Sequence, residues 1–469
     1  MDITKIEKHK HYYFIGIGGT GMSALARALL EMGVRVSGSD LNETITTIKL
    51  KDLGANIYIG HSKNNLQKAQ IIVVSTAINN NNPELKFAKE EKIPILHRAD
   101  LLSHFINACP KSIIVTGTHG KTTTSAMLVQ ILTTLFNKVP TFIIGSTLNN
   151  FNKNSHISDS EYGVFEADES DGSFTKLAPY ATIISNLEAE HLEYYNNEET
   201  LLNTFQTYIH TLLKKDKIVL INRECPQLQK ITHSIKNKNL HHFSLNEKQS
   251  IHTHNIQTTS KGISCKIKHK DKTYPLDLQI FGHHNIENAI SALSFIALEQ
   301  QNIEPSCKSL NSFTGTKRRT EWIGKANNID IYDDYAHHPS EIHCTLKGLK
   351  ESLKRPLLCI FQPHRYSRTL NHFNKFAEAF EFADTAIITK IYAASETAIP
   401  NITAKELQEQ ISKTWPNKTI LFIQQKSLIA KQIMKKLKKN QVIITMGAGD
   451  IHTVSKEILT QLKQHNYNA

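Results

Sequence analysis

Long hydrophobic runs are absent from this sequence of 469 residues. Its apolar stretches are the size of single strands and are broken by glycine or polar residues, whereas a membrane-spanning helix needs about 20 consecutive apolar residues. The N-terminal stretch Met1–Lys10 is polar and charged and contains no apolar signal-peptide core. We therefore expect a cytoplasmic protein without membrane insertion.

Cysteine is also scarce, and no Cys-x-x-Cys pair or other zinc-binding spacing occurs. The six cysteines are Cys109, Cys225, Cys265, Cys307, Cys344 and Cys359. Such widely separated cysteines are typical of reduced thiols in a cytosolic protein.

A basic helix and an aromatic RNA-binding motif are missing too, although the net charge is +12 and the isoelectric point is near 9.2. The lysines are scattered along the chain. We interpret them as a solvated surface with some charge for anionic ligands, and expect no nucleic-acid partner.

The sequence pattern predicts an α/β protein with three domains. The hydrophobic content of 40% and the charged content of 21% are those of a globular protein, and 469 residues exceed the size of one core. Strands alternate with helices in the first and third segments, which predicts two doubly wound parallel sheets. The middle segment adds a polar stretch, 234–278, which we predict to form small antiparallel strands. The predicted domains are 1–109, 110–314 and 315–469.

The stretch Ile113–Thr124 reads IIVTGTHGKTTT. A β-branched strand, a turn with two glycines and a helix start are typical of a triphosphate-binding loop, since glycines let backbone N–H groups approach phosphates. The P-loop motif is incomplete, because Val115 stands where its first glycine belongs. We still expect Lys121 to reach the phosphates of ATP, and Thr122 or Thr123 to bind Mg²⁺.

A second glycine-rich turn, Gly16–Gly21, follows a predicted strand and has the G-x-G-x-x-G spacing. Asp40 lies 19 residues beyond Gly21, where a carboxylate can accept hydrogen bonds from a ribose. Alone, this pattern would indicate an NAD-dependent oxidoreductase, or merely a tight turn that needs glycine. Together, the two turns favour ATP-driven chemistry on a nucleotide-linked substrate.

Two polar clusters follow apolar strands of the middle segment: Glu166–Asp171 (EADESD) and Asn186–His191 (NLEAEH). An acidic loop is usually just solvated, but beside a triphosphate loop its carboxylates are candidate Mg²⁺ ligands. We expect adjacent parallel strands to bring Glu166 and His191 to the same edge of the sheet.

Two further clusters follow strands of the third segment: Asp333–Pro339 (DDYAHHP) and Gln362–Arg368 (QPHRYSR). Arg365 and Arg368 are three residues apart and suit the recognition of a carboxylate or phosphate. Each loop alone is most simply a surface turn, but two at neighbouring strand ends favour a binding site.

These motifs together resemble the Mur ligase family over nearly the whole chain. The segments that carry the resemblance are Gly16–Ala24, Thr116–Thr124, Glu166–Asp171, Asn186–His191, His284–Ala289, Arg318–Arg319, Asp333–Pro339, Pro363–Thr369 and Gly447–Ile451. The family implies an N-terminal Rossmann-like domain, a central P-loop-type ATPase domain and a C-terminal Rossmann-like domain.

The resemblance also implies the reaction, which is the ATP-dependent ligation of an amino acid to a UDP-sugar carboxylate through an acyl phosphate. The first motif is similar to that of the members that use UDP-N-acetylmuramate and L-alanine. The expected cofactors are ATP and Mg²⁺, with Mn²⁺ as a substitute, and the expected state is a monomer or weak homodimer.

The resemblance implies roles for individual residues. The UDP sugar is expected at Gly18, Gly19, Thr20, Gly21 and Asp40. ATP is expected at Gly117, Thr118, His119, Gly120, Lys121, Thr122, Thr123, Asn285, Asn288, Arg319 and Asp334. The metal is expected at Thr122, Glu166 and His191. L-Alanine is expected at Tyr335, His337, Arg365 and Arg368. The expected catalytic residues are Lys121, Glu166, His191, His337 and Arg365.

The sequence departs from the family pattern at Lys317, Ala336 and the Ala394–Glu396 stretch. No lysine stands between His191 and Lys214, so we expect no carbamylated lysine there. The remaining alternatives are an NAD-dependent oxidoreductase, a non-enzymatic ATP switch and a ligase that recycles a tripeptide. The chain ends soon after the third segment, so no fused second ligase is expected.

Overall fold

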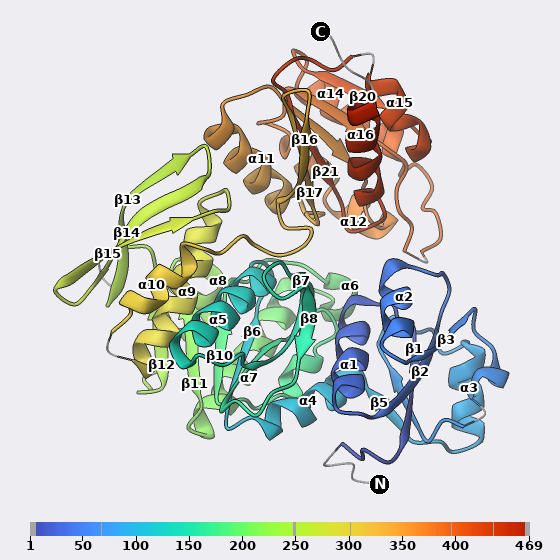
Figure 1. The fold of residues 1–469 in the computed structure, drawn as a ribbon, viewed down its shortest axis with the longest axis vertical. Helices are drawn as coiled ribbons and strands as arrows, with labels where there is room; N and C mark the ends of the chain where they lie inside the picture. Colours follow the sequence, from blue (N-terminus) through green and yellow to red (C-terminus); the bar gives the residue numbers. More distant parts are fainter. Residues whose placement is uncertain are drawn as a thin grey trace. The chain divides into compact units, whose positions relative to one another are not determined.

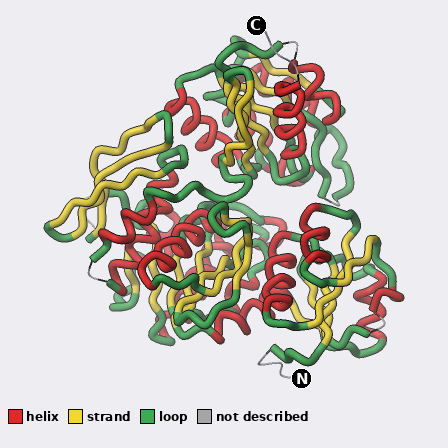
Figure 2. The backbone as a smooth tube through the Cα atoms, in the orientation of Figure 1, coloured by secondary structure: helices red, strands yellow, loops and turns green. Residues whose placement is uncertain are grey.

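The computed structural model describes residues 6–66, 68–246, 250–300, 302–394, 396–434 and 436–464. The chain divides into two compact units. Unit 1 contains the chain up to His252 with Lys268–Tyr274 and Glu287–Leu310, and unit 2 contains Thr253–Ile267, Pro275–Ile286 and the chain from Asn311 onward. In both units, helices flank strands (Figure 2), which confirms the predicted α/β class. No helix among the described residues is long and apolar enough to span a membrane.

The first sheet of unit 1 is parallel and has the strand order β3-β2-β1-β4-β5 (Figure 1). Its elements are β1 (His11–Ile15), α1 (Thr20–Glu31), β2 (Arg35–Asp40), α2 (Ile45–Asp52), β3 (Asn56–Ile59), β4 (Ile71–Val74), α3 (Pro83–Glu90), β5 (Ile95–His97) and α4 (Arg98–Ala108). The order reverses between β1 and β4, and ligands of doubly wound folds bind at such a switch point.

The second sheet of unit 1 has the order β12-β11-β10-β6-β9-β7-β8, and only β8 is antiparallel to its neighbour. Its elements are β6 (Lys111–Thr116), α5 (Lys121–Phe136), β7 (Thr141–Leu148), β8 (Lys153–His156), β9 (Tyr162–Glu166), β10 (Ala181–Ile184), α6 (Leu192–Tyr195), α7 (Glu198–Lys214), β11 (Ile218–Asn222), α8 (Pro226–Thr232) and β12 (Leu240–Phe243).

Strand order corrects two predictions about the middle segment. β9 and β10 are not adjacent, because β6 lies between them, although all three are parallel and end at the same edge. β12 falls in the stretch predicted to form antiparallel strands but pairs in parallel with β11. Residues 251–278 form a three-stranded sheet whose strands are joined by two-residue turns, and such short turns fit the predicted antiparallel pairing. Its strands are β13 (Ile251–Thr259), β14 (Gly262–His269) and β15 (Lys272–Leu278).

Unit 2 contains a six-stranded sheet with the order β16-β17-β21-β18-β19-β20. Its elements are β16 (Glu321–Ala326), β17 (Ile329–Asp334), α11 (Pro339–Leu353), β18 (Leu357–Phe361), α12 (Tyr366–Asn371), α13 (Phe373–Glu378), β19 (Thr385–Ile388), α14 (Ala404–Thr414), β20 (Thr419–Phe422), α15 (Ile429–Met434), β21 (Val442–Met446) and α16 (His452–Gln464). All strands except the edge strand β16 are parallel. Asp333–Pro339 begins at the end of β17, and Gln362–Arg368 follows β18. The prediction that these two loops lie at neighbouring strands is therefore wrong, because β21 lies between β17 and β18.

One apolar core joins both sheets of unit 1. It includes Leu29 of α1 and Phe105 of α4 from the first sheet, together with Phe165 and Phe205 from the second. Helices α9 (His284–Glu299) and α10 (Glu304–Leu310) follow the three-stranded sheet, and α10 packs against α5. The glycine-rich turn and the triphosphate loop are thus carried by sheets that share a core.

A polar cluster closes the opposite, N-terminal ends of the second sheet's strands. The carboxylate of Glu299 accepts hydrogen bonds from Tyr162 (3.0 Å) and Tyr180 (2.7 Å) and lies 3.2 Å from the ammonium of Lys111. The Glu299 side chain is only 9% exposed, so water cannot easily replace these partners.

We expect Glu299→Ala to lower the free energy of unfolding by about 1–3 kcal/mol, since it leaves two tyrosine hydroxyls and a lysine without their shared acceptor. Urea denaturation followed by far-UV circular dichroism measures this change. Glu304→Ala is the matched control, because Glu304 forms an exposed pair with Lys308 and its removal should leave the free energy of unfolding almost unchanged. Equal losses in the two variants would contradict the prediction.

Candidate active site

The triphosphate loop of unit 1 is a tight turn between β6 and α5 that only glycine can complete. Gly117 has φ +116°, and a Cβ atom there would lie 2.6 Å from the Asn186 carbonyl. Gly120 has φ +83°, and its Cβ would overlap the side-chain oxygen of Asn288. The two glycines therefore bring the loop close to the end of β10 and to α9.

Asn186, which follows β10, fixes this loop by hydrogen bonds to His119 and Thr118. Its side-chain oxygen accepts a hydrogen bond from the His119 N–H (2.8 Å), and its side-chain nitrogen donates to the His119 carbonyl (3.2 Å). Its backbone carbonyl accepts from the Thr118 N–H (3.0 Å). The sequence predicts no role for Asn186, because a contact across 67 residues leaves no local signal.

Lys121 folds back over the loop. Its ammonium donates to the carbonyls of Gly117 (2.6 Å) and Thr118 (2.9 Å) and to the carboxylate of Glu169 (2.8 Å). Burial lowers the pKa of Lys121, but the carboxylates of Glu169 and Asp168 outweigh it and raise that pKa above its usual value. The ammonium is thus held protonated at the position where a phosphate anion is expected.

Glu166 faces the start of α5. Its carboxylate accepts from the Thr122 hydroxyl (2.9 Å) and from the Gly145 N–H (2.9 Å). Two of the three predicted metal ligands, Thr122 and Glu166, are therefore in contact. Thr123 follows Thr122 on α5 and is buried.

His191, the third predicted metal ligand, lies in a different group. Its ring is 3.5 Å from Glu169, and the ligand atoms of Asp168, Glu169 and His191 all lie within 4.8 Å of one another. Burial alone would lower the pKa of His191, but the carboxylates of Glu169 and Glu193 outweigh it and raise that pKa to about 10. Asp168, Glu169 and His191 offer two carboxylates and an imidazole, a donor set that fits a divalent cation.

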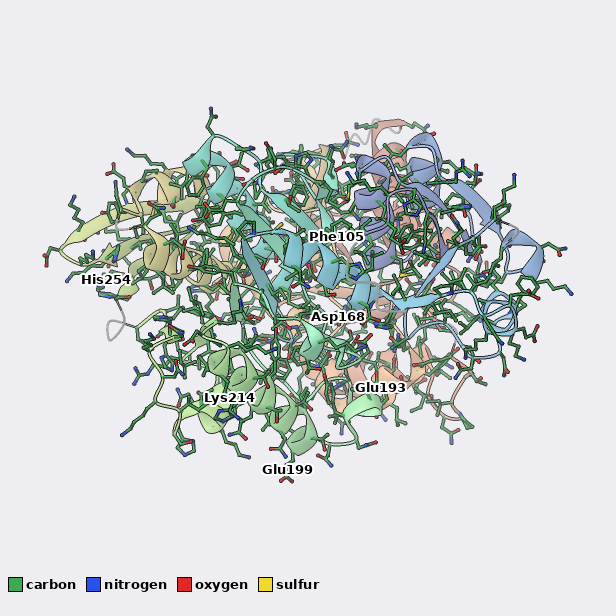
Figure 3. All side chains as sticks on the ribbon, turned by 90° about the horizontal axis from the view of Figure 1, so that it is seen from below. Phe105, Asp168, Glu193, Glu199, Lys214 and His254 are labelled. Atoms are coloured by element: carbon green, nitrogen blue, oxygen red, sulfur yellow. The ribbon has the colours of Figure 1, made fainter. Side chains whose placement is uncertain are left out.

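Asp168 lies in the acidic motif Glu166–Asp171, but the sequence does not predict it as a site residue. Figure 3 labels it among the side chains of unit 1, well away from Glu199 and Lys214 of α7 at the lower edge of the view. Burial opposes its charge, but the nearby Arg98 and Lys121 outweigh burial and lower the pKa of Asp168 to about 2. It is therefore a carboxylate at any physiological pH.

The glycine-rich turn lies at the switch point of the first sheet. The N–H of Gly18 donates to the Asp40 carboxylate (2.9 Å), and those of Gly16 and Ile17 donate to the Ser39 carbonyl (each 2.9 Å). Helix α1 then begins at Thr20, with Gly19 at its N-cap and no side chain capping it. Its first N–H groups and its dipole favour an anion, as expected for a diphosphate.

Beneath Asp40 lies a buried carboxylate that we did not predict. Glu84 on α3 is fully buried. Its oxygens accept from five donors, namely Tyr13 (2.8 Å), Ser39 (2.5 Å), His61 (3.1 Å), Asn65 (2.8 Å) and the N–H of Ser62 (3.2 Å). This network fixes the end of β2, and with it the residue next to Asp40.

In unit 2, two aspartates at the end of β17 anchor the surrounding loops. Asp333 accepts from Arg318 (3.1 Å) and Thr445 (2.6 Å), and burial raises its pKa to about 6. Asp334 accepts from both the N–H (2.6 Å) and the hydroxyl (3.0 Å) of Thr320 and from the Ala336 N–H (2.7 Å). These contacts give Asp334 an anchoring role, and the structure does not test its predicted role in binding ATP.

Tyr335 lies under two cations. The guanidinium carbons of Arg318 and Arg319 are 5.0 and 5.4 Å from the centre of its ring. Arg319 also lies 3.6 Å from Glu341 on α11. The predicted residues Arg319 and Tyr335 are thus brought together, and Arg318 joins them.

Two imidazoles and two arginines lie near Tyr335, namely His337, His364, Arg365 and Arg368. Nδ1 of His337 is 3.0 Å from the Tyr335 carbonyl, and Nδ1 of His364 is 3.3 Å from Arg368. The rings of His337 and His364 are 5.9 Å apart. Arg365 has φ +68°, and its N–H donates to the Tyr392 carbonyl (2.8 Å).

The imidazoles in this group are neutral at physiological pH. Burial, followed by the charges of Arg368 and Arg365, lowers the pKa of His364 to about 3. Burial and Arg368 also lower the pKa of His337 well below 6.5. The positive charge here is therefore carried by arginine, which suits an anionic group such as a carboxylate.

The two predicted adenine contacts lie at the start of α9. Asn288 accepts a hydrogen bond from Thr124 of α5 (3.3 Å), and Asn285 donates to the Phe281 carbonyl (2.6 Å).

Of the departures from the family pattern, Lys317 pairs with Glu321 (2.6 Å). Ser395, within the Ala394–Glu396 stretch, lies outside the described residues.

Curated relatives and solved structures resemble the chain over nearly its full length. The UDP-N-acetylmuramate–L-alanine ligase of Dictyoglomus turgidum is 38% identical over 455 residues, which cover 96% of this chain and 97% of the relative. The crystal structure of UDP-N-acetylmuramate-alanine ligase MurC from Thermotoga maritima matches with a TM-score of 0.84 and 28% identity, covering 97% of this chain and all of that one. A murein peptide ligase from Psychrobacter arcticus shares the fold, with a TM-score of 0.70 and 24% identity over 98% of this chain and all of the other.

Three family models match successive parts of the chain. They are the Mur ligase family catalytic domain at residues 11–109, the Mur ligase middle domain at 115–296 and the glutamate ligase domain of Mur ligases at 318–449. The chain belongs to the Mur ligase family.

Proposed function

We propose that this protein uses ATP to join L-alanine to the lactyl carboxylate of UDP-N-acetylmuramate, releasing ADP and phosphate. The observation that carries the proposal is the contact of Lys121 with the triphosphate loop and with Glu169, next to the Asp168–Glu169–His191 group. The names of the full-length relatives supply the substrates. We further propose that it acts in the cytoplasm, where its nucleotide-linked substrate is made.

The first step is phosphoryl transfer. An oxygen of the lactyl carboxylate attacks the γ-phosphorus of ATP, the bond to the ADP oxygen breaks, and an acyl phosphate forms. Such a transfer is catalysed mainly by positioning and charge neutralisation, and Lys121 supplies a cation at the phosphates. Thr122, Glu166 and His191 would hold Mg²⁺, or Mn²⁺ in its place, and the bound ion would supply further positive charge.

The second step forms the amide. The amine of L-alanine attacks the acyl carbon, a tetrahedral oxyanion forms, and its collapse expels phosphate. Arg365 and Arg368 bind the alanine carboxylate. Because Nδ1 of His337 faces the Tyr335 carbonyl, the neutral ring carries its proton on Nδ1 and leaves Nε2 to accept the amine proton.

The remaining predicted residues bind the two nucleotides. The turn Gly18–Gly21 and the start of α1 hold the UDP diphosphate, and Asp40 accepts from the ribose. Gly117–Thr123 cradle the ATP phosphates, while Asn285 and Asn288 contact the adenine. On unit 2, Arg319 and Asp334 are the residues that we propose to bind ATP, and Tyr335 is proposed to contribute to alanine binding.

Phosphate release from ATP and Mg²⁺ should require UDP-N-acetylmuramate and L-alanine together, and Lys121→Ala should reduce the rate at least about 100-fold because a transition-state cation is lost. A coupled phosphate assay measures both. Lys138→Ala, which removes an exposed lysine paired with Asp159, should retain the wild-type rate. Release that ignores both substrates would favour an ATP switch, and release that needs a tripeptide would favour a recycling ligase.

Arg368→Ala should raise the KM for L-alanine about 10- to 100-fold, the loss expected for one charge-assisted hydrogen-bonding partner. Initial rates against alanine concentration give the KM, and calorimetry gives the Kd of UDP-N-acetylmuramate, which should not change. Lys405→Ala, an exposed lysine paired with Glu409 in the same unit, is the control. An unchanged KM would remove Arg368 from the alanine site.

The low pKa of His364 predicts a loss of stability in acid. Between its unfolded pKa near 6.5 and its folded pKa of about 3, the unfolded chain binds one more proton, so stability falls as the pH falls through this window. We expect His364→Gln to reduce this dependence by up to about 1.4 kcal/mol per pH unit. Both tryptophans, Trp322 and Trp415, lie in unit 2, so tryptophan fluorescence during urea denaturation reports this unit. The free energy of unfolding is compared between about pH 4.5 and 6.5, which lies between the two pKa values. If it depends on pH equally in the wild type and the variant, the low pKa of His364 is wrong.

A further inference from the structure

Arg98, the first residue of α4, lies between the two nucleotide sites of unit 1, although no sequence motif pointed to it. One terminal nitrogen of its guanidinium lies 3.1 Å from Asp168 and 3.4 Å from Asp171. Both belong to the stretch Glu166–Asp171, here called the acidic loop. The other terminal nitrogen lies 3.7 Å from the position that a Cβ atom would take at Gly21, in the glycine-rich turn. One planar cation therefore faces both the proposed diphosphate site and the acidic loop.

The acidic loop continues the contact toward the ATP site. Glu169, next to Asp168 in the chain, binds the Lys121 ammonium (2.8 Å) and lies 3.5 Å from His191. Arg98 thus faces the glycine-rich turn and pairs with Asp168, whose carboxylate lies within 4.8 Å of ligand atoms of Glu169 and His191. Charged side chains therefore lie between the glycine-rich turn and the triphosphate loop.

Folding alone does not explain Arg98. Asp171 is nearly fully buried, but it already accepts from the Ser173 N–H (3.0 Å), the Ser173 hydroxyl and Thr76 (3.2 Å). The side chain of Asp168, by contrast, is 42% exposed, so solvent screens its pair with Arg98 and reduces what that pair contributes to stability. Arg98 instead fixes the position of the Asp168 carboxylate.

We infer that Arg98 is a positioning residue that couples binding of the UDP sugar to binding of the divalent cation. Without ligands, Arg98 pairs with Asp168. A diphosphate at the glycine-rich turn attracts the same guanidinium, which weakens its hold on Asp168 and makes that carboxylate available beside Glu169 and His191. The inference rests on the proposed function, because it takes the ligand of the turn to be the diphosphate of a UDP sugar.

Such coupling must be reciprocal, and it can be measured without ATP or catalysis. Electron paramagnetic resonance of unbound Mn²⁺ gives the Mn²⁺ affinity with and without UDP-N-acetylmuramate, and calorimetry gives the affinity for the sugar with and without Mn²⁺. In the wild type, we expect each ligand to tighten the other at least about fivefold.

Arg98→Ala should remove this effect. We expect the affinity for UDP-N-acetylmuramate without metal to fall at least about tenfold, because a charge-assisted partner of the diphosphate is lost. The affinity for Mn²⁺ without the sugar should be no weaker than in the wild type, and the coupling factor should fall to about one. Lys176→Ala is the matched control, because it removes a cation that follows the acidic loop but pairs with Asp100 (3.2 Å), and it should keep the full coupling.

The outcomes separate the two proposals. If the wild type binds the sugar but shows no coupling, or if Arg98→Ala keeps it, the inference is wrong and the proposed function stands. If the wild type does not bind UDP-N-acetylmuramate at all, both fail. Circular dichroism establishes whether Arg98→Ala is folded. If it is not, Arg98→Lys takes its place and should lose at least about half of the coupling factor, because a lysine cannot contact two partners with one planar group.

Discussion

The contact on which the ATP site depends is the one that Lys121 makes with its own loop and with Glu169. An ammonium can donate to two backbone carbonyls and one carboxylate only if the loop turns tightly around it, which is why glycine is needed at 117 and 120. The same contact pulls the acidic loop toward α5 and places His191 next to Glu169. The loop geometry, the charge of the lysine and the Asp168–Glu169–His191 group are therefore parts of one arrangement.

The two units handle charge in different ways. In unit 1, carboxylates outnumber cations around the triphosphate loop, which suits a site that takes up a divalent cation together with phosphate. In unit 2, arginines provide the charge, while burial keeps His337 and His364 neutral and raises the pKa of Asp333. The imidazoles of this group therefore add no positive charge, and an anionic group such as a carboxylate would pair with the arginines.

The predictions that failed concern neighbours in space. The sequence predicts which strands exist, but β6 inserts between β9 and β10, and β21 inserts between the strands that carry His337 and Arg365. Strand β3 lies at the edge of its sheet and its side chains are mostly exposed, so it lacks the apolar pattern that identifies a buried strand. Helix α7, in contrast, has a clear signal in the sequence, because Leu201, Phe205 and Leu212 follow the helical period.

The sequence by itself determined the α/β class, the two nucleotide-type turns and most residues of the candidate site. These features are local, since a glycine turn, a lysine after it and a polar cluster after a strand each occupy a few consecutive residues. Only the tertiary structure decided that Asn186 braces the triphosphate loop, that Glu84 supports the residue beside Asp40, and that Arg98 pairs with Asp168. Each of these contacts joins residues dozens of positions apart. Their formation depends on strand order and on helix packing against a shared core, which no short stretch of sequence encodes.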